Sequence, residues 1–185
     1  PQGEIGFYLD PGMAFGTGNH ETTKLCLEAI VAIKNEKGSQ NQNPESFLDL
    51  GCGSGIIAIT AKLLGYDRVE GIDMDPDAVR IALENATLNS IPDISFHSCS
   101  IDGVDLKLPY DVVVANIQTD VLRDFSEKIL NLVQSKGILI LSGILTKEVN
   151  ELGRHYQDTI KVLGKEAHIE TKSLNEWSSI TLRYA

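Results

Sequence analysis

No stretch of this sequence stays apolar for long. Hydrophobic residues make up 42% of the 185 residues, but no run of them approaches the roughly 20 residues that a membrane-spanning helix requires. No segment with the pattern of a signal peptide opens the chain, which begins at Pro1. We therefore expect a cytoplasmic protein without a membrane partner, and a piece that was excised or processed from a longer product.

Paired cysteines are also missing. The three cysteines are Cys26, Cys52 and Cys99, and none of them belongs to a C-x-x-C pair. An odd number without such spacing argues against both a disulfide framework and a zinc site. The pattern predicts reduced thiols, which fits the cytoplasm, and no metal centre.

Positive charge is scarce. The chain has 16 Lys and Arg against 26 Asp and Glu, which gives a formal net charge of −10 at pH 7. Nucleic-acid-binding proteins usually carry a basic patch, and none is visible here, so we expect no direct contact with nucleic acid. An acidic surface suits a basic partner because opposite charge speeds encounter, although solubility alone would also explain the charge.

Alternate glycines are the most informative feature that is present. Residues 47–55, F-L-D-L-G-C-G-S-G, form a short apolar run that ends in an acid and continues into Gly51, Gly53 and Gly55. A helical pattern follows and stops at Gly65. Strand, glycine turn and helix in this order are typical of the entry to a doubly wound α/β domain.

The spacing of these glycines distinguishes between nucleotide cofactors. A dinucleotide fingerprint, G-x-G-x-x-G, would need glycine in place of Ile56, which disfavours a nicotinamide oxidoreductase. The observed G-x-G-x-G resembles motif I of class I S-adenosylmethionine-dependent methyltransferases. Asp73 ends the next strand about 20 residues later, where an acid accepts hydrogen bonds from ribose hydroxyls. We interpret glycines and acid together as a nucleoside-cofactor site instead of a turn that only packs strand on helix.

Strand and helix patterns alternate along the rest of the chain. They predict an α/β fold with a doubly wound, mainly parallel, seven-stranded sheet and an antiparallel pair at its C-terminal end. We expect one Rossmann-like domain over residues 1–185, in which residues 1–45 form an N-terminal loop and helix with a short strand near residues 5–9. The seven sheet strands are predicted at residues 47–50, 68–73, 94–97, 110–115, 137–142, 160–163 and 177–183, and the helices after Asn19, Gly55, Asp75 and Asp120 and from Thr146 to Tyr156.

The segment before the first helix carries a longer signature. Residues 10–23, D-P-G-M-A-F-G-T-G-N-H-E-T-T, resemble the D-P-G-x-A-F-G-T-G-x-H-x-T-T pattern of the PrmA-type methyltransferases, which methylate large-ribosomal-subunit protein eleven. The resemblance continues in order through residues 48–55, 71–76, 113–117 and 141–145, so it covers nearly the whole chain. It implies S-adenosylmethionine as cofactor and a protein amino group as acceptor, with lysine of a ribosomal protein expected.

The resemblance also implies roles for residues at matching positions. The glycines would hold the methionine part of the cofactor, whose carboxylate suits backbone N–H donors. Asp73 would bind the ribose, Met74 would lie along the adenine, and Asn116 would face the methyl group as the catalytic residue. The implied cofactor-binding residues are Phe15, Gly16, Thr17, Gly18, Thr23, Gly51, Gly53, Gly55, Asp73, Met74 and Asn116.

Several neighbouring residues receive structural interpretations. The glycines and polar side chains of residues 15–23 predict a mobile flap over the cofactor. Within this segment, His20 is expected to position the loop by a hydrogen bond instead of acting as a general base. Asp49 is interpreted as a carboxylate that stabilises the turn, and Asp75 as a helix cap.

Two departures from the family concern the acceptor. Gln118, Thr119 and Asp120 follow the Asn-Ile pair where the family has Leu-Ala-like residues, and the family's N-terminal recognition domain has no counterpart before Pro1. The alternatives are therefore another protein lysine, a small molecule, or a non-catalytic module that only binds S-adenosylmethionine. A nucleic-acid base methyltransferase is disfavoured, because Asn116 is not followed by Pro-Pro and an aromatic residue.

Overall fold

The signature segment lies largely outside the part of the chain whose structure is described. The computed structural model describes residues 6, 8, 20–39, 45–104 and 108–185. Asn19, after which the first helix was predicted, and most of the strand expected near residues 5–9 therefore fall outside the described residues. No helix within the described ranges is long and apolar enough to cross a membrane.

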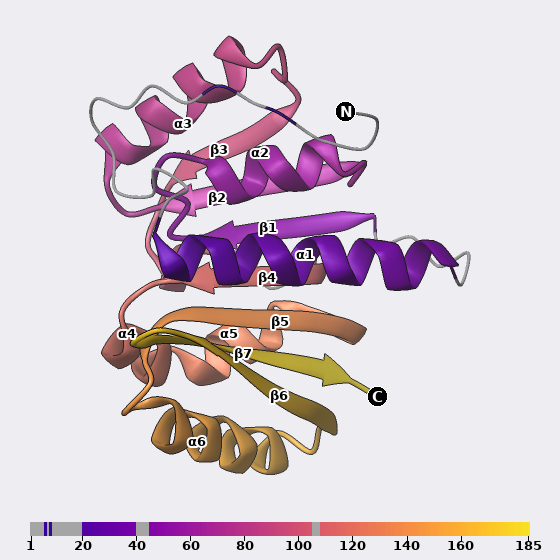
Figure 1. The fold of residues 1–185 in the computed structure, drawn as a ribbon, viewed down its shortest axis with the longest axis vertical. Helices are drawn as coiled ribbons and strands as arrows, with labels where there is room; N and C mark the ends of the chain where they lie inside the picture. The colour runs from indigo at the N-terminus through magenta and orange to yellow at the C-terminus, as the bar shows by residue number, and fades with distance from the viewer. Residues whose placement is uncertain (1–5, 7, 9–19, 40–44, 105–107) are drawn as a thin grey trace.

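Seven strands form one mixed sheet (Figure 1). In chain order they are β1 (Ser46–Leu50), β2 (Arg68–Asp73), β3 (Ile94–Ser98), β4 (Tyr110–Asn116), β5 (Val133–Leu145), β6 (Ala167–Leu174) and β7 (Trp177–Tyr184). Their order across the sheet is β3-β2-β1-β4-β5-β7-β6. The first five strands are parallel, and β7 lies antiparallel between β5 and β6. The predicted doubly wound sheet with an antiparallel C-terminal pair is thus confirmed.

The described helices cover both faces of this sheet. They are α1 (Glu21–Ser39), α2 (Ile56–Leu63), α3 (Pro76–Leu88), the 3-10 helix η1 (Ile101–Gly103), α4 (Thr119–Asp124), α5 (Ser126–Asn131) and α6 (Val149–Val162). Apolar side chains of α1, α2 and α3 pack in one core, and those of α4, α5 and α6 pack in a second. The sheet separates these two cores.

The central strand β4 contributes to both cores. Val112 and Val114 belong to the core beneath α1, α2 and α3, whereas Val113 and Ala115 belong to the core beneath α4, α5 and α6. All four side chains are fully buried. A strand that is covered on both faces has no polar alternation, which explains why this segment is continuously apolar.

The chain changes direction across the sheet at β1. It proceeds outward from β1 to β2 and β3, and then continues on the other side of β1 with β4 and β5 (Figure 1). The carboxyl ends of β1 and β4 therefore form a topological switch point, where open α/β sheets bind ligands. The register places Leu50 of β1 beside Ile72 of β2 and beside Ala115 of β4. The residues that follow these three positions consequently meet at one edge.

The position predicted for the sixth strand was wrong. Residues 160–163 belong to the end of α6 and the turn after it, and the strand is β6. Ile160 is buried in the core, whereas Val162 is 86% exposed, as expected for neighbouring positions on an amphipathic helix. The short run of apolar residues obscured this helical period. The buried residues of α6 are Val149, Leu152, Tyr156 and Ile160.

The helices on the second face also differ in detail from the prediction. The single helix expected after Asp120 is divided at Phe125 into α4 and α5. Gln118 is the N-cap residue of α4, so Asp120 lies in its first turn, where a carboxylate still complements the helix dipole. The helix expected from Thr146 begins at Val149.

Candidate functional site

The turn between β1 and α2 depends on its glycines. Gly51, Gly53 and Gly55 all have positive φ angles, of 72°, 51° and 78°, a region that side chains rarely adopt. The N–H of Gly51 donates to the carbonyl of Ile72 at 2.8 Å, which holds the turn against the end of β2. A Cβ atom at Gly51 would overlap the Cγ2 atom of Ile117, so no side chain fits at this point.

We expect Gly51→Ala to lower the free energy of unfolding by about 2–5 kcal/mol, because a left-handed backbone and an overpacked contact add their strains. Gly164→Ala is a matched control. Gly164 also has a positive φ, of 65°, but a Cβ there would meet nothing within 4 Å. Gly164→Ala should lower the free energy of unfolding only by the cost of the left-handed backbone, about 1–2 kcal/mol. Urea denaturation measures both losses, and equal values would show that Ile117 yields to the added methyl group.

Asp73 ends β2 and connects it to the glycine turn. Its Oδ2 accepts the N–H of Gly53 at 3.0 Å, and its Oδ1 accepts the N–H of Asp75 at 3.0 Å. Each carboxylate oxygen can accept a further hydrogen bond, so this geometry is compatible with the expected ribose contact. Met74 is 80% exposed beside it. Asp75 caps α3, as predicted, by accepting the N–H of Asp77 at 2.9 Å.

Asn116 ends β4 at the same edge of the sheet. It pairs in register with Ser142 of β5, whose Oγ donates to the carbonyl of Thr22 at 3.0 Å. This bond brings the start of α1, with the buried Thr23, close to the ends of β4 and β5. The carboxyl edge of the sheet therefore gathers Thr23, Gly51, Gly53, Gly55, Asp73, Met74 and Asn116, whereas Phe15, Gly16, Thr17 and Gly18 lie outside the described residues.

The residue after Asn116 is enclosed by two glycines. A Cβ atom at Gly143, whose φ is 81°, would overlap the carbonyl oxygen of Ile117 and come within 3.0 Å of its carbonyl carbon. On the other side, the Cγ2 atom of Ile117 fills the space that a Cβ atom at Gly51 would need. The sequence analysis did not single out Gly143, although a glycine directly after the strand predicted at residues 137–142 was the available signal; in the structure it lies within β5.

His20 lies immediately before α1. Its Nδ1 is 2.9 Å from the Oγ1 of Thr22, and its carbonyl accepts the N–H of Lys24 at 3.1 Å. Its ring packs edge-on against Trp177, with ring centroids 5.0 Å apart. These contacts anchor the imidazole to α1 and β7, which favours the expected positioning role.

Asp49 is more unusual than its position in the sequence suggests. It is fully buried in β1, and its Oδ2 accepts the N–H of Ala58 at 3.1 Å. The bond caps α2, whose N-cap residue Gly55 makes no side-chain cap, in agreement with the turn-stabilising role. Its Oδ1 is buried without a hydrogen-bond partner among the described residues. Burial raises the pKa of this carboxyl from 3.8 to about 7, Asp73 adds to the rise, and the bond from Ala58 opposes it.

The first turn of α2 offers hydrogen-bond donors to a ligand. Asp49 occupies the N–H of Ala58, but those of Ile56 and Ile57 have no acceptor within the described part of the chain. Such groups stand at the positive end of the helix dipole and suit an anion.

The three cysteines are free thiols, as predicted. Burial raises the pKa of Cys26 to about 12, so this thiol stays neutral at physiological pH. Within the described ranges, no group of three or more His, Cys, Asp or Glu side chains is arranged to hold a metal ion.

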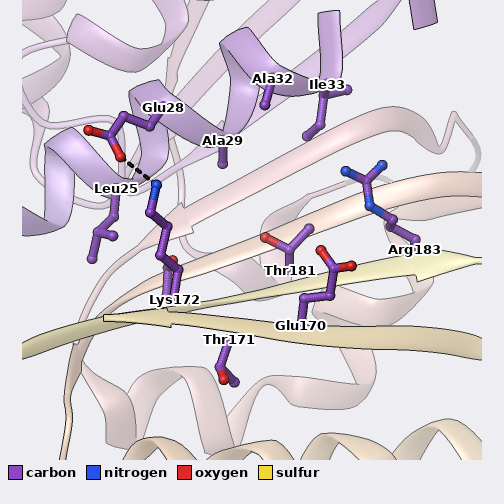
Figure 2. A pocket seen from close by; sticks show the side chains of 11 residues that line it. Leu25, Glu28, Ala29, Ala32, Ile33, Glu170, Thr171, Lys172, Thr181 and Arg183 are labelled. Carbon is purple, nitrogen blue, oxygen red and sulfur yellow. Dashed lines mark hydrogen bonds and ion pairs between the residues drawn. The ribbon is translucent and has the colours of Figure 1, made fainter. Parts of the chain in front are cut away.

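A cleft of about 510 Å³ lies between α1 and the β6–β7 hairpin (Figure 2). Among the described side chains, two ion pairs join α1 to the hairpin. Lys172 contacts Glu28 at 2.7 Å, and Arg183 contacts Glu36 at 3.2 Å. None of the expected cofactor residues that the structure describes lines this cleft, so we assign it no part in cofactor binding.

Comparison with known proteins decides the family. The sequence matches the family model described as "Ribosomal protein L11 methyltransferase (PrmA)" over residues 1–184. The chain belongs to this family. Membership in the PrmA family confirms the resemblance inferred from the sequence, including the signature segment outside the described residues.

Individual PrmA-family relatives match most of the chain. A "Ribosomal protein L11 methyltransferase" of Thiobacillus denitrificans is 46% identical over 149 residues, which cover 80% of this chain and 47% of the relative. One of the same name from Caldicellulosiruptor saccharolyticus is 36% identical over 177 residues, covering 95% and 53%. The chain thus spans about half the length of the curated relatives it matches. A crystal structure of a ribosomal protein L11 methylase from Lactobacillus delbrueckii subsp. bulgaricus has a TM-score of 0.78 at 29% identity, over 95% of this chain and 83% of that chain.

Proposed function

We propose that this chain transfers methyl groups from S-adenosylmethionine to lysine amino groups of a protein, with ribosomal protein L11 as the expected acceptor. The observation that carries the proposal is the connection of the glycine turn to Asp73 at the switch point, through the 3.0 Å bond from the N–H of Gly53. Family membership and relatives named for L11 support the reaction and the acceptor. The free thiols support a cytoplasmic location.

The residues present fit this cofactor. The methionine carboxylate would accept the N–H groups of Ile56 and Ile57 at the start of α2. Asp73 would accept the ribose hydroxyls, with the exposed Met74 along the adenine. The absence of a side chain at Gly51 leaves room for Ile117, the residue that follows Asn116.

The protein's contribution to methyl transfer is position and environment. Bound S-adenosylmethionine supplies an activated methyl group for in-line displacement. A free lysine has a pKa of about 10.4, so only about one side chain in a few thousand is neutral at pH 7. The lysine ammonium must therefore lose a proton to water before the amine can attack. Desolvation at the site favours this loss, because it disfavours the charged form. Asn116 would orient the neutral amine through its side-chain oxygen, so that nitrogen, methyl group and sulfur lie in line.

The rim beside Asn116 favours a basic protein segment as acceptor. Gln118 and Asp120 are exposed there, and the Oγ1 of Thr119 is held by Glu148 at 2.8 Å. The carboxylates of Asp120 and Glu148 would attract a lysine-rich segment and repel nucleic acid. This charge supports a protein acceptor over the small-molecule alternative.

Ligand-dependent melting tests the cofactor. A saturating ligand at about 100 times its Kd stabilises the folded state by about 2.7 kcal/mol, so S-adenosylmethionine should raise Tm by roughly 5–10 °C. Asp73→Ala should largely remove this shift at the same ligand concentration. Asp158→Ala is the control, because the Asp158 side chain is 78% exposed on α6. Stabilisation by NADH but not by S-adenosylmethionine would contradict the proposal.

Transfer of radiolabelled methyl groups tests the acceptor. Purified ribosomal protein L11 and a lysate of the source organism are incubated with the protein and labelled cofactor. Because the chain spans about half of its relatives, we expect slow transfer to L11, which a preceding recognition segment, if the gene encodes one, would accelerate. Transfer to small molecules alone would identify a small-molecule methyltransferase. Cofactor binding without any transfer would identify a binding module.

A further inference from the structure

The buried carboxylate of Asp49 is only half satisfied. One oxygen caps α2 through Ala58, and the other is buried without a partner in the described part of the chain. Buried polar atoms almost always find a hydrogen bond, and one that does not calls for an explanation. The helix cap does not explain this arrangement, because it uses only the Oδ2 atom and leaves Oδ1 buried.

The surroundings of Asp49 contain no compensating cation. Asp73 of β2 adds negative charge, and the buried thiols of Cys26 in α1 and Cys52 in the turn are neutral. Its neighbour in β4 is the apolar Val114. Among the described residues, no positively charged side chain contributes to its ionisation. The helix α2 supplies only the positive end of its dipole.

We propose that Asp49 is a proton-exchanging counter-charge for the cofactor: it is protonated in the ligand-free protein and releases that proton to solvent when the cationic methyl donor binds at the glycine turn. This inference rests on the proposed function, because the donor carries a sulfonium and an ammonium group. Asp49 lies two residues before Gly51 and contacts the first turn of α2, so the same turn encloses Asp49 and would bind the donor.

The electrostatics fix the direction of the coupling. The pKa of Asp49 is about 7 without ligand, and a positive charge within about 4–6 Å lowers a carboxyl pKa by roughly 1–3 units. At pH 6 the ligand-free side chain is therefore mostly protonated, and the liganded one is at least about half ionised. Each unit corresponds to about a tenfold change in affinity, so donor affinity should rise at least about tenfold between pH 5 and pH 8. The demethylated product lacks the sulfonium charge and should release less of the proton.

Isothermal titration calorimetry at pH 6 in two buffers with different ionisation enthalpies counts the protons released. The α-amino group of either ligand is fully protonated at this pH. Wild-type protein should release roughly 0.4–0.9 proton per S-adenosylmethionine bound, and a smaller fraction per demethylated product. Asp49→Asn should release none, and its affinity should change less than about twofold between pH 6 and pH 7.5. Asp158→Asn, on the exposed surface of α6, should behave as wild type.

Carboxyl-carbon NMR of the wild-type protein gives an independent readout if Asp49→Asn does not fold. The Asp49 resonance should titrate near pH 7 without ligand and at a clearly lower pH with S-adenosylmethionine. Donor binding without proton release, release retained in Asp49→Asn, or an Asp49 titration near pH 4 would each overturn this inference and leave the proposed function intact. Failure of either ligand to bind would instead overturn the proposed function.

Discussion

Asp49→Asn should be more stable than the wild-type protein at pH 8, and its advantage should shrink as the pH falls. Asparagine has the shape of the neutral acid and removes the buried charge. The pKa of Asp49 is about 7 in the folded protein and 3.8 in the reference state, so the folded state binds more protons between these values. Stability from Asp49 is therefore complete below about pH 4 and is lost as the pH rises to 7. We expect the variant's advantage to grow by roughly 2–3 kcal/mol from pH 5 to pH 8.

Urea denaturation of the ligand-free proteins at both pH values measures this difference. Asp158→Asn serves as the matched control, because its side chain is 78% exposed and the same substitution there should change stability by less than about 0.5 kcal/mol. A stability difference for Asp49→Asn that does not vary with pH would show that Asp49 is already ionised at pH 5.

Asn116→Ala should lower turnover by about a hundredfold while leaving cofactor affinity within about threefold. Asn116 lies at the end of β4, and the proposed mechanism uses it to orient the acceptor amine; a lost orientation of this kind costs roughly two orders of magnitude in rate. An interaction made mainly in the transition state reduces kcat without a matching change in ground-state binding. Single-turnover methylation of the acceptor and calorimetric binding of S-adenosylmethionine separate the two quantities.

The control for this variant is Asn150→Ala, which removes an exposed asparagine from α6. It should keep both turnover and affinity. Unchanged turnover for Asn116→Ala on the true acceptor would remove Asn116 from the mechanism. A parallel loss of cofactor affinity would instead place this side chain in the cofactor site alone.

The sequence predicted features that depend on local backbone sterics. The glycine turn was recognisable because only glycine readily adopts the φ angles of Gly51, Gly53 and Gly55. Asn116 was recognisable because it ends a strongly apolar strand, and Asp73 because it ends the strand about 20 residues after the glycines. By contrast, the Oδ1 atom of Asp49 lacks a partner among the described residues because elements distant in the sequence bury it. No residue near Asp49 in the sequence indicates that burial.

The C-terminal hairpin shows why one strand was misplaced. β6 lies at the edge of the sheet, and all of its side chains are at least partly exposed. Its sequence, A-H-I-E-T-K-S-L, therefore has no clear apolar face that would mark a strand. Residues 160–163 drew the strand prediction because three of the four are apolar, although Val162 among them is 86% exposed.

The enclosure of Ile117 by Gly51 and Gly143 restricts how this family can change during evolution. A larger residue at either glycine would displace the segment that presents Asn116, so substitutions at these three positions should arise together or not at all. Gln118 and Asp120 are exposed and free of this constraint. New acceptor preferences should therefore accumulate at residues 118–120, while the donor-binding turn remains as it is.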